Sequence, residues 1–376
     1  MKKVKLGEVC EIRIGKTPNR SQSLYWGGDY PWLSISDMKG KILCTTKEKI
    51  TQEAVEKEKM QIVSKGTVVM SFKLSIGKVG ILAENMYTNE AIANFVVKNN
   101  KMLFNEYLYY ALQGMNFDSL TDRAVMGKTL NKAKLNNLSI VYNEPFMQQQ
   151  IVLRLDGVNK LIESRKQQLS ELSKLVKSRF NEMFGDPVLN EMGWDKCRLK
   201  DISEEKLAYG SGASAIEFSG LRYIRITDID TCGNLKPEKK SPSQFDEKYL
   251  LNTGDILFAR SGATVGKTFL YSKKKHGPAL YAGYLIRLIP NHSLVNPIFV
   301  YHFTKTKYYN DFIAKVQNAV AQPNINAKQY SELDFILPPL SLQNEFADFV
   351  AQVDKSQFAC QKAIKLWRNS LKSSII

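Results

Sequence analysis

The chain has 376 residues, 44 % of them hydrophobic, which is room for two or three domains with cores of their own. Apolar runs stay below the ~18 residues of a membrane-spanning helix, and we find no apolar segment typical of a secretion signal. The five cysteines are scattered and lack CxxC spacing. We therefore expect a reduced, cytoplasmic protein without membrane contact. Lys and Arg number 53 against 37 Asp and Glu, a charge of +16, which favours a polyanionic partner such as nucleic acid over a role in solubility alone.

Residues 1–144 predict a first globular domain. The segment YPWLSISDM alternates apolar and polar residues and ends in Asp37, as short strands before a turn do. In VSKGTVVMSF, Gly66 is a turn glycine that opens a buried strand. The segment NEYLYYALQG is expected to be helical. Short strands mixed with one or two helices predict an α+β domain.

Residues 145–184 predict one long helix. Apolar residues recur in alternating steps of three and four from Ile151 onward, which is the heptad pattern of a coiled coil. At about 1.5 Å per residue the helix would be roughly 58 Å long. Because such a helix cannot cover its own apolar stripe, it needs a partner helix.

Residues 185–340 repeat the first domain. The segment LRYIRITDI corresponds to YPWLSISDM, and LNTGDILFAR corresponds to VSKGTVVMSF, with Gly254 at the place of Gly66. The segment PNINAKQYSELDFILPPL corresponds to KTLNKAKLNNLSIVYNEP, with Asn326 lying 195 positions after Asn131. We therefore predict a second, similar α+β domain.

Residues 341–376 predict a second long helix in the same heptad register. A shift of 195 positions places Phe346 on Ile151 and Val350 on Leu155. The two helices are expected to bury each other's apolar stripes. The alternative is two unrelated amphipathic helices on separate domains. The predicted seam contains Ile151, Leu155, Val158, Ile162, Leu169, Leu172, Val176, Phe346, Val350, Val353, Ile364 and Trp367.

Three segments resemble catalytic or ligand motifs. Gly262–Thr268 resembles a phosphate-binding loop, but only three residues separate its glycines, where a true loop has about four. The segment NEPF at 143–146 resembles the tetrapeptide of adenine methyltransferases, yet a glycine-rich cofactor loop is lacking, so it is interpreted as a helix start. His276, His292 and His302 lack metal-ligand spacing, and we expect no metal site and no catalytic residue.

Candidate DNA-contact residues lie in polar and basic turns between the expected strands. Asn and Gln pair with adenine, Arg pairs with guanine, and Lys contacts phosphate. For Asn131 and Asn326 a shared structural turn is an open alternative. The candidates are Lys73, Lys78, Lys128, Thr129, Asn131 and Lys132 in the first domain, and Arg222, Arg225, Arg260, Ser261, Lys267, Gln322, Asn324, Asn326 and Lys328 in the second.

The order of these segments resembles the specificity subunit of Type I restriction–modification systems over essentially the whole chain. The segments EPFMQQQIVLRLDGVNKLI and PPLSLQNEFADFVAQVDKS at the helix starts carry the resemblance, together with MFGDPVLNEMGW and NINAKQYSELDFILPPL. It implies two target-recognition domains, each followed by a long helix, and the two helices would form an antiparallel coiled coil.

The resemblance also implies a function. Each domain would read one half of a bipartite site in double-stranded DNA, and the helices would set the spacer. Two methyltransferase subunits, with translocating nuclease subunits as further partners, would carry S-adenosylmethionine, ATP and Mg, so that this chain would bind no cofactor itself. A free-standing DNA-binding protein, such as a repressor, and a coiled-coil protein adaptor are the alternatives.

Overall fold

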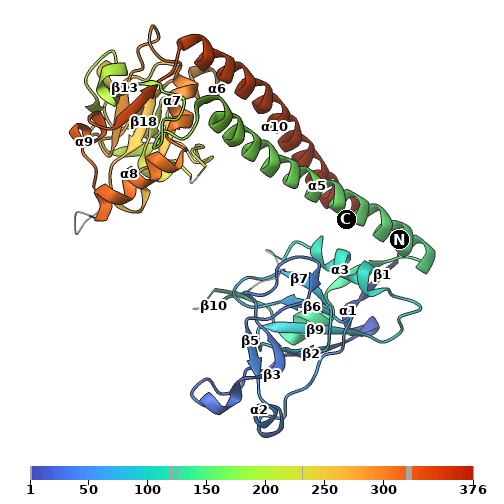
Figure 1. Ribbon diagram of the computed structural model, residues 1–376. Helices are drawn as coiled ribbons and strands as arrows, with labels where there is room; N and C mark the ends of the chain where they lie inside the picture. The colour runs from blue at the N-terminus through green and yellow to red at the C-terminus, as the bar shows by residue number, and fades with distance from the viewer. Residues whose placement is uncertain (1, 118–121, 125–126, 231, 319–323, 376) are drawn as a thin grey trace. The chain divides into compact units, whose positions relative to one another are not determined.

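The computed structural model describes residues 2–117, 122–124, 127–230, 232–318 and 324–375. The chain divides into two compact units (Figure 1). The first unit contains Met1–Lys166 and Lys362–Ile376, and the second contains Gln167–Gln361. Both mix short strands with helices, which confirms the α+β class.

In the first unit, a five-stranded sheet holds its strands in the order β2-β9-β6-β7-β4. A three-stranded sheet has the order β5-β3-β8, and β1 pairs with β12 near the start of α5. The elements are β1 (Lys2–Lys5), α1 (Leu6–Val9), β2 (Cys10–Ile14), β3 (Trp26–Leu33), β4 (Ile42–Leu43), β5 (Glu48–Ile50), α2 (Gln52–Lys57), β6 (Val68–Ser71), β7 (Val79–Leu82), β8 (Tyr87–Thr88), β9 (Ile92–Val97), α3 (Asn105–Gln113), β10 (Asp122–Ala124), β11 (Gly127–Thr129), α4 (Lys132–Asn137), β12 (Ser139–Tyr142) and the start of α5 (Pro145–Phe184).

The second unit repeats this plan. Its four-stranded sheet has the order β14-β21-β18-β19, β13 pairs with β22, and the parallel pair β16-β20 corresponds to β3-β8. The elements are the end of α5, β13 (Asp195–Arg198), η2 (Leu199–Ile202), β14 (Ala208–Tyr209), β15 (Ala215–Glu217), β16 (Arg222–Ile224), η3 (Ile226–Asp228), β17 (Lys240–Pro242), η4 (Glu247–Tyr249), β18 (Ile256–Ala259), η5 (Gly262–Thr264), β19 (Thr268–Leu270), α6 (Lys273–His276), β20 (Ala279–Tyr281), β21 (Leu285–Leu288), α7 (Pro297–Phe303), α8 (Lys307–Asn318), α9 (Ala327–Ser331), β22 (Asp334–Leu337) and the start of α10 (Leu340–Ile375).

The aromatic residues of β3 belong to the interior of the first unit. Trp32 is fully buried, its indole Nε1 donates to the carbonyl of Lys16 at 3.0 Å, and Trp26 packs edge-on against it. The Arg20 guanidinium lies 3.9 Å from the centre of the Trp26 ring. These rings therefore form a small core of their own under the loop that precedes β3.

Helices α5 and α10 run antiparallel within the second unit (Figure 1). Phe180 packs edge-on against Phe346, with ring centres 5.4 Å apart. Earlier in α5, Ser173 accepts a hydrogen bond from Gln357 at 3.3 Å. As the residue number falls along α5, the partner's number rises along α10, which defines opposite directions. In the first unit, Leu371 packs against the core cluster that contains Leu155.

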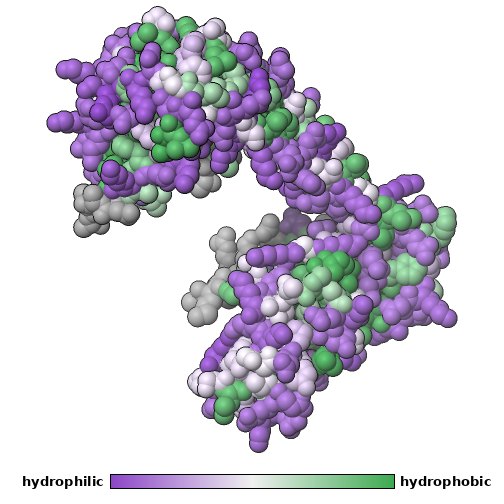
Figure 2. Space-filling view, in the orientation of Figure 1, coloured by the Kyte–Doolittle hydropathy of each residue, from purple (hydrophilic) through white to green (hydrophobic). Residues whose placement is uncertain are grey.

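The predicted seam residues lie on the covered side of these helices. Those that are buried are Leu155, Ile162, Val176, Phe346, Val350, Val353 and Ile364. Those that are half-buried are Ile151, Val158, Leu169, Leu172 and Trp367. Figure 2 shows a surface that is mostly hydrophilic over these helices in the view drawn, with some hydrophobic residues.

The heptad assignment fails near the end of α5. Further heptad steps from Val176 would place Arg179 in the seam, whereas the structure buries Phe180 and Phe184. Arg179 lies at the edge of the interface and donates to Glu345 at 3.0 Å. A straight helix has 3.6 residues per turn rather than 3.5, so its apolar face drifts by about 20° per heptad, and aromatic residues one position later enter the core.

A polar network attaches α5 to the first domain. The Asp156 carboxylate pairs with the Lys41 ammonium at 2.5 Å and accepts a hydrogen bond from the Tyr110 hydroxyl. Asn159 donates to the same hydroxyl at 3.0 Å. Burial, together with this carboxylate, raises the pKa of Tyr110, so its hydroxyl stays protonated.

Candidate nucleic-acid interface

A group of exposed and half-buried polar and aromatic side chains lies beyond the end of β18 in the second unit. The Arg260 guanidinium lies 4.6 Å from the centre of the Tyr209 ring, and its Nε donates to Asn324 Oδ1 at 3.3 Å. The Tyr209 hydroxyl accepts a hydrogen bond from the backbone of Ala327 at 3.0 Å. Three segments that are distant in the sequence therefore meet at Arg260.

Backbone hydrogen bonds hold this surface in place. The Ile325 N–H donates to the Arg260 carbonyl at 2.8 Å, and the Arg260 N–H donates to the Tyr284 carbonyl at 3.1 Å. Ser261 and Asn324 form an isolated β-bridge. Tyr284 is 62 % exposed. We call Tyr209, Arg260, Ser261, Tyr284 and Asn324 the second-unit surface.

The second-unit surface has the groups that nucleic-acid recognition requires. Arg and Asn donors and acceptors suit base edges, and a Tyr ring or a guanidinium plane can stack on an unpaired base. The candidates predicted from the sequence include Arg260, Ser261 and Asn324 of this surface but not Tyr209 and Tyr284. The available signal was an aromatic residue beside a glycine, as in Tyr209-Gly210 and Gly283-Tyr284.

The corresponding turn of the first unit follows β6. Here the Leu130 N–H donates to the Phe72 carbonyl at 3.0 Å, as Ile325 does to Arg260 in the second unit. The turn carries Lys73, whose ammonium lies 5.4 Å from the Phe72 ring centre, and Leu74, which is 69 % exposed with φ +62°. We call residues 73–78 the first-unit turn. It is basic and aliphatic, whereas the second-unit surface carries tyrosines and an arginine.

In each turn, one glycine with a positive φ directs the backbone toward the lysine that follows it. Gly77 has φ +85° and Gly266 has φ +84°, a conformation that favours glycine. A Cβ on Gly266 would come within 2.8 Å of Ile313. After these glycines, Lys78 is exposed and donates to the Ile35 carbonyl at 3.2 Å, while Lys267 is half-buried and donates to the Ile229 carbonyl at 3.3 Å.

Asn131 and Asn326 are helix caps. Asn131 Oδ1 accepts from the Lys134 N–H at 2.8 Å at the start of α4, and Asn326 Oδ1 accepts from the Gln329 N–H at 2.8 Å at the start of α9. Gln329 completes a capping box by accepting from the Asn326 N–H at 2.9 Å. Of the two alternatives open from sequence, the shared structural turn describes both residues.

Two candidate arginines make contacts inside the second domain. Arg222 is only 7 % exposed and donates to the Lys236 carbonyl at 2.8 Å. Arg225 forms two hydrogen bonds to the buried Asp228 carboxylate, at 2.7 and 3.1 Å. Both guanidinium groups are thus held by acceptors of their own domain, because a cation removed from water needs such partners.

The remaining candidates lie around these turns. Lys132 and Lys328 are exposed in the first turns of α4 and α9. Lys128 and Thr129 belong to β11, but their side chains are outside the described part of the structure, and Gln322 is outside the described residues.

The segments that resemble catalytic motifs have structural roles. Pro145 begins α5, which confirms the helix start expected for NEPF. The glycine turn Gly262–Thr264 is followed by strand β19 rather than by the helix that a phosphate-binding loop requires. In the described ranges, no three His, Cys, Asp or Glu residues are grouped as metal ligands. Nor does any described helix have both the length and the apolarity needed to cross a membrane.

The comparisons with known proteins agree on one family. The family model for the Type I restriction modification DNA specificity domain matches residues 1–174 and 191–366. The MjaIX specificity subunit of a Type I restriction enzyme from Methanocaldococcus jannaschii is 26 % identical over 69 % of this chain and 66 % of its own length, just under two thirds. The EcoDI specificity subunit from Escherichia coli is 22 % identical over 94 % of this chain and 81 % of its own length.

Solved structures share the fold. The Type I restriction–modification S subunit from M. genitalium matches with a TM-score of 0.56 and 14 % identity, over 100 % of this chain and 96 % of that chain. A chain from a structure of a Type I system, described in terms of complex assembly and conformational transition, matches with a TM-score of 0.65 and 16 % identity, over 100 % of this chain and 96 % of that chain.

Proposed function

The chain belongs to the Type I restriction modification DNA specificity family, which covers residues 1–174 and 191–366, and we propose that it is the DNA sequence-recognition subunit of such a system. It is a non-catalytic specificity subunit. Methylation and cleavage are then performed by partner subunits, which hold S-adenosylmethionine, ATP and Mg. We place the complex in the cytoplasm, where its DNA substrate is.

Each unit reads one half of a bipartite site in double-stranded DNA. The observation that carries this proposal is that the same fold occurs twice in the chain, and that the turns at equivalent positions carry different side chains. The first-unit turn presents Lys73, Leu74 and Lys78, and the second-unit surface presents Arg260 with two tyrosines. Equivalent positions with different chemistry predict two different half-sites. The net charge of +16 supports contact between both units and the phosphates of the DNA.

Helices α5 and α10 set the spacer and provide the surface on which two methyltransferase subunits dock, with restriction subunits as further partners. The antiparallel pairing of the two helices within the second unit supports this proposal. Half-sites read from one side of B-DNA lie about one helical turn, or 34–36 Å, apart. A helix of 40 residues exceeds that length, at roughly 60 Å.

The decisive experiment maps methylated adenines in cells that contain this chain and its methyltransferase. Replacing residues 1–144 by the first domain of another family member is expected to change one half-site and leave the other intact. The point variant Arg260→Ala is expected to relax only the half-site that the second unit reads. If both half-sites changed together in either variant, the assignment of one half-site to each unit would be wrong. A complex that lacks DNA binding at every salt concentration would instead support a protein adaptor.

A further inference from the structure

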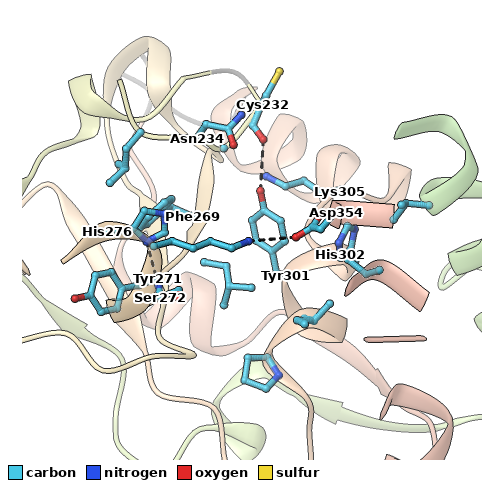
Figure 3. A pocket seen from close by; sticks show the side chains of 18 of the residues that line it. Cys232, Asn234, Phe269, Tyr271, Ser272, His276, Tyr301, His302, Lys305 and Asp354 are labelled. Carbon is cyan, nitrogen blue, oxygen red and sulfur yellow. Dashed lines mark hydrogen bonds and ion pairs between the residues drawn. The ribbon is translucent and has the colours of Figure 1, made fainter. Parts of the chain in front are cut away.

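The second unit contains a cleft of about 1040 Å³, bordered by α5, α7 and α10, that shares none of the residues of the second-unit surface (Figure 3). His276, His292 and His302, which are scattered in the sequence, all line it. Sites for small ligands have volumes of about 300–1,000 Å³. The cleft lies just above this range and is therefore large enough for a whole small molecule.

The charged residues that line the cleft are mostly positive. Its cationic lining consists of Lys177, Arg222, Lys236, Lys239, Lys275 and Lys305. Asp354 is the sole carboxylate among the described lining residues, and it pairs with Lys275 at 3.2 Å. Cations from separate elements thus converge on one volume, which attracts a compact anion.

Arg222 is buried and Lys305 is half-buried among these cations. The Lys305 ammonium donates to Thr268 Oγ1 at 2.9 Å and lies 4.5 Å from the centre of the Tyr301 ring. Burial lowers the pKa of Lys305 to about 8. Arg222 is only 7 % exposed, and its Nε has no hydrogen-bond partner among the described residues. An anion in the cleft would give both groups a charged acceptor.

The cleft also has an apolar part. Figure 3 shows Phe269 and Tyr301 among the lining side chains, and Leu235 and Ile298 are half-buried in the lining. Aromatic and aliphatic walls beside a few convergent polar groups are typical of sites for ligands with a ring. The lining thus has one region for charge and another for a ring.

In the described part of the first unit, the corresponding helix makes a different contact with its domain. There Asp156 of α5 contacts Lys41 and Tyr110, whereas the residue 195 positions later is Ala351. In the first unit a salt bridge joins the long helix to its domain. In the second unit a basic cleft lies beside the corresponding helix.

We propose that this cleft binds a phosphate-bearing small molecule of nucleotide size, with its phosphates near Lys305 and Arg222 and its ring against the apolar wall. A phosphate chain carries at least two negative charges and several acceptor oxygens, which suits clustered lysines better than a single carboxylate does. The second-unit surface contributes no residue to this cleft.

The test uses the purified full chain and measures binding of ADP and of inorganic pyrophosphate by calorimetry. ADP is expected to bind saturably, and Lys305→Met is expected to weaken binding by about tenfold, the loss of one charge-assisted hydrogen bond. The matched control is Lys57→Met, an exposed lysine at the end of α2 in the first unit. ADP is expected to bind more tightly than pyrophosphate, because pyrophosphate has no ring.

A second measurement needs no substitution. Cys232 lines the cleft and is exposed, and Cys44 is exposed in the first unit. ADP is expected to slow alkylation of Cys232 while Cys44 reacts unchanged. The proposal is overturned if ADP does not bind or leaves Cys232 unprotected, if both lysine variants bind equally well, or if pyrophosphate binds as tightly as ADP.

Discussion

Gln148 and Gln343 make the same three hydrogen bonds in the two halves of the chain. Each is fully buried in the first turns of a long helix. Gln148 Nε2 donates to the carbonyls of Met102 and Asn143, both at 2.8 Å, and Gln343 Nε2 donates to those of Leu294 and Pro338, at 3.2 and 2.8 Å. Each Oε1 accepts from the backbone N–H just before the domain helix, at 3.0 Å from Phe104 and at 2.9 Å from Asn296.

These glutamines anchor each long helix to its domain, so their loss should be costly. Gln148→Ala and Gln343→Ala are each expected to lower the free energy of unfolding by about 2–4 kcal/mol, because buried backbone groups lose their partners. Urea unfolding measures the effect, and the exposed neighbour Gln149→Ala is the control. A change below 0.5 kcal/mol in Gln148→Ala, roughly that of an ordinary surface substitution, would contradict this role.

Substitutions at Asn326 separate helix capping from base reading. Asn326→Ala is expected to lower stability by about 1 kcal/mol, as loss of an N-cap does. Asn326→Asp keeps the acceptor and is expected to retain both stability and the methylated motif. The measurements are thermal unfolding and methylation mapping. An altered motif in Asn326→Asp would show that the side-chain amide contacts a base.

Phosphate binding by the turn lysines predicts a change in salt dependence. Lys78→Ala and Lys267→Ala are each expected to weaken DNA binding without changing the target, since contacts to phosphate carry little sequence information. The slope of log K against log salt should fall by about 0.9 for each phosphate that a lysine no longer neutralises. Titrations at several salt concentrations measure it, with Lys57→Ala as the control. An unchanged slope would exclude that lysine from the interface.

The second unit should lose stability in mild acid. Burial, and secondarily the charge of Lys305, lowers the pKa of His302 to about 4. The unfolded chain, with a His pKa of about 6.5, then binds the proton more readily than the folded chain, so stability falls as the pH drops below about 6.5. Between pH 7 and 5 this one group accounts for about 2 kcal/mol.

Burial also lowers the pKa of His276, which acts in the same direction. In His302→Gln the free energy of unfolding is expected to fall by about 2 kcal/mol less between pH 7 and 5 than in the unaltered chain. Urea unfolding at both pH values measures this difference. An equally steep loss of stability in His302→Gln would assign the effect to other groups.

The spacer should follow the length of the helices. The two units divide at Lys166 in α5 and at Gln361 in α10. Inserting four residues after both positions adds nearly one turn to each helix and leaves the pairing inside each unit unchanged. The added length is about 6 Å, close to two base pairs at about 3.4 Å each. The methylated motif of this double insertion should have a longer spacer, and an unchanged spacer with good methylation would show that the helices do not measure the site.

The sequence by itself determined the repeated architecture and the two long helices. Their signals are local: a heptad pattern from Ile151 to Val176, and the repeated segments around Asn131 and Asn326. It also contained the signal of the Arg225–Asp228 pair, because the partners are three positions apart. Periodicity and short-range contacts depend only on neighbours along the chain, and so the residues themselves specify them.

Only the tertiary structure decided which side chains are free to contact DNA or a ligand. Arg222 and Arg260 are alike in sequence, yet one is buried on carbonyls of its own domain and the other stacks on Tyr209 at the surface. The second-unit surface combines residues from four segments, and the cleft brings together three histidines that sequence spacing separates. Burial and convergence depend on how distant segments pack, and no pattern of neighbouring residues contains that information.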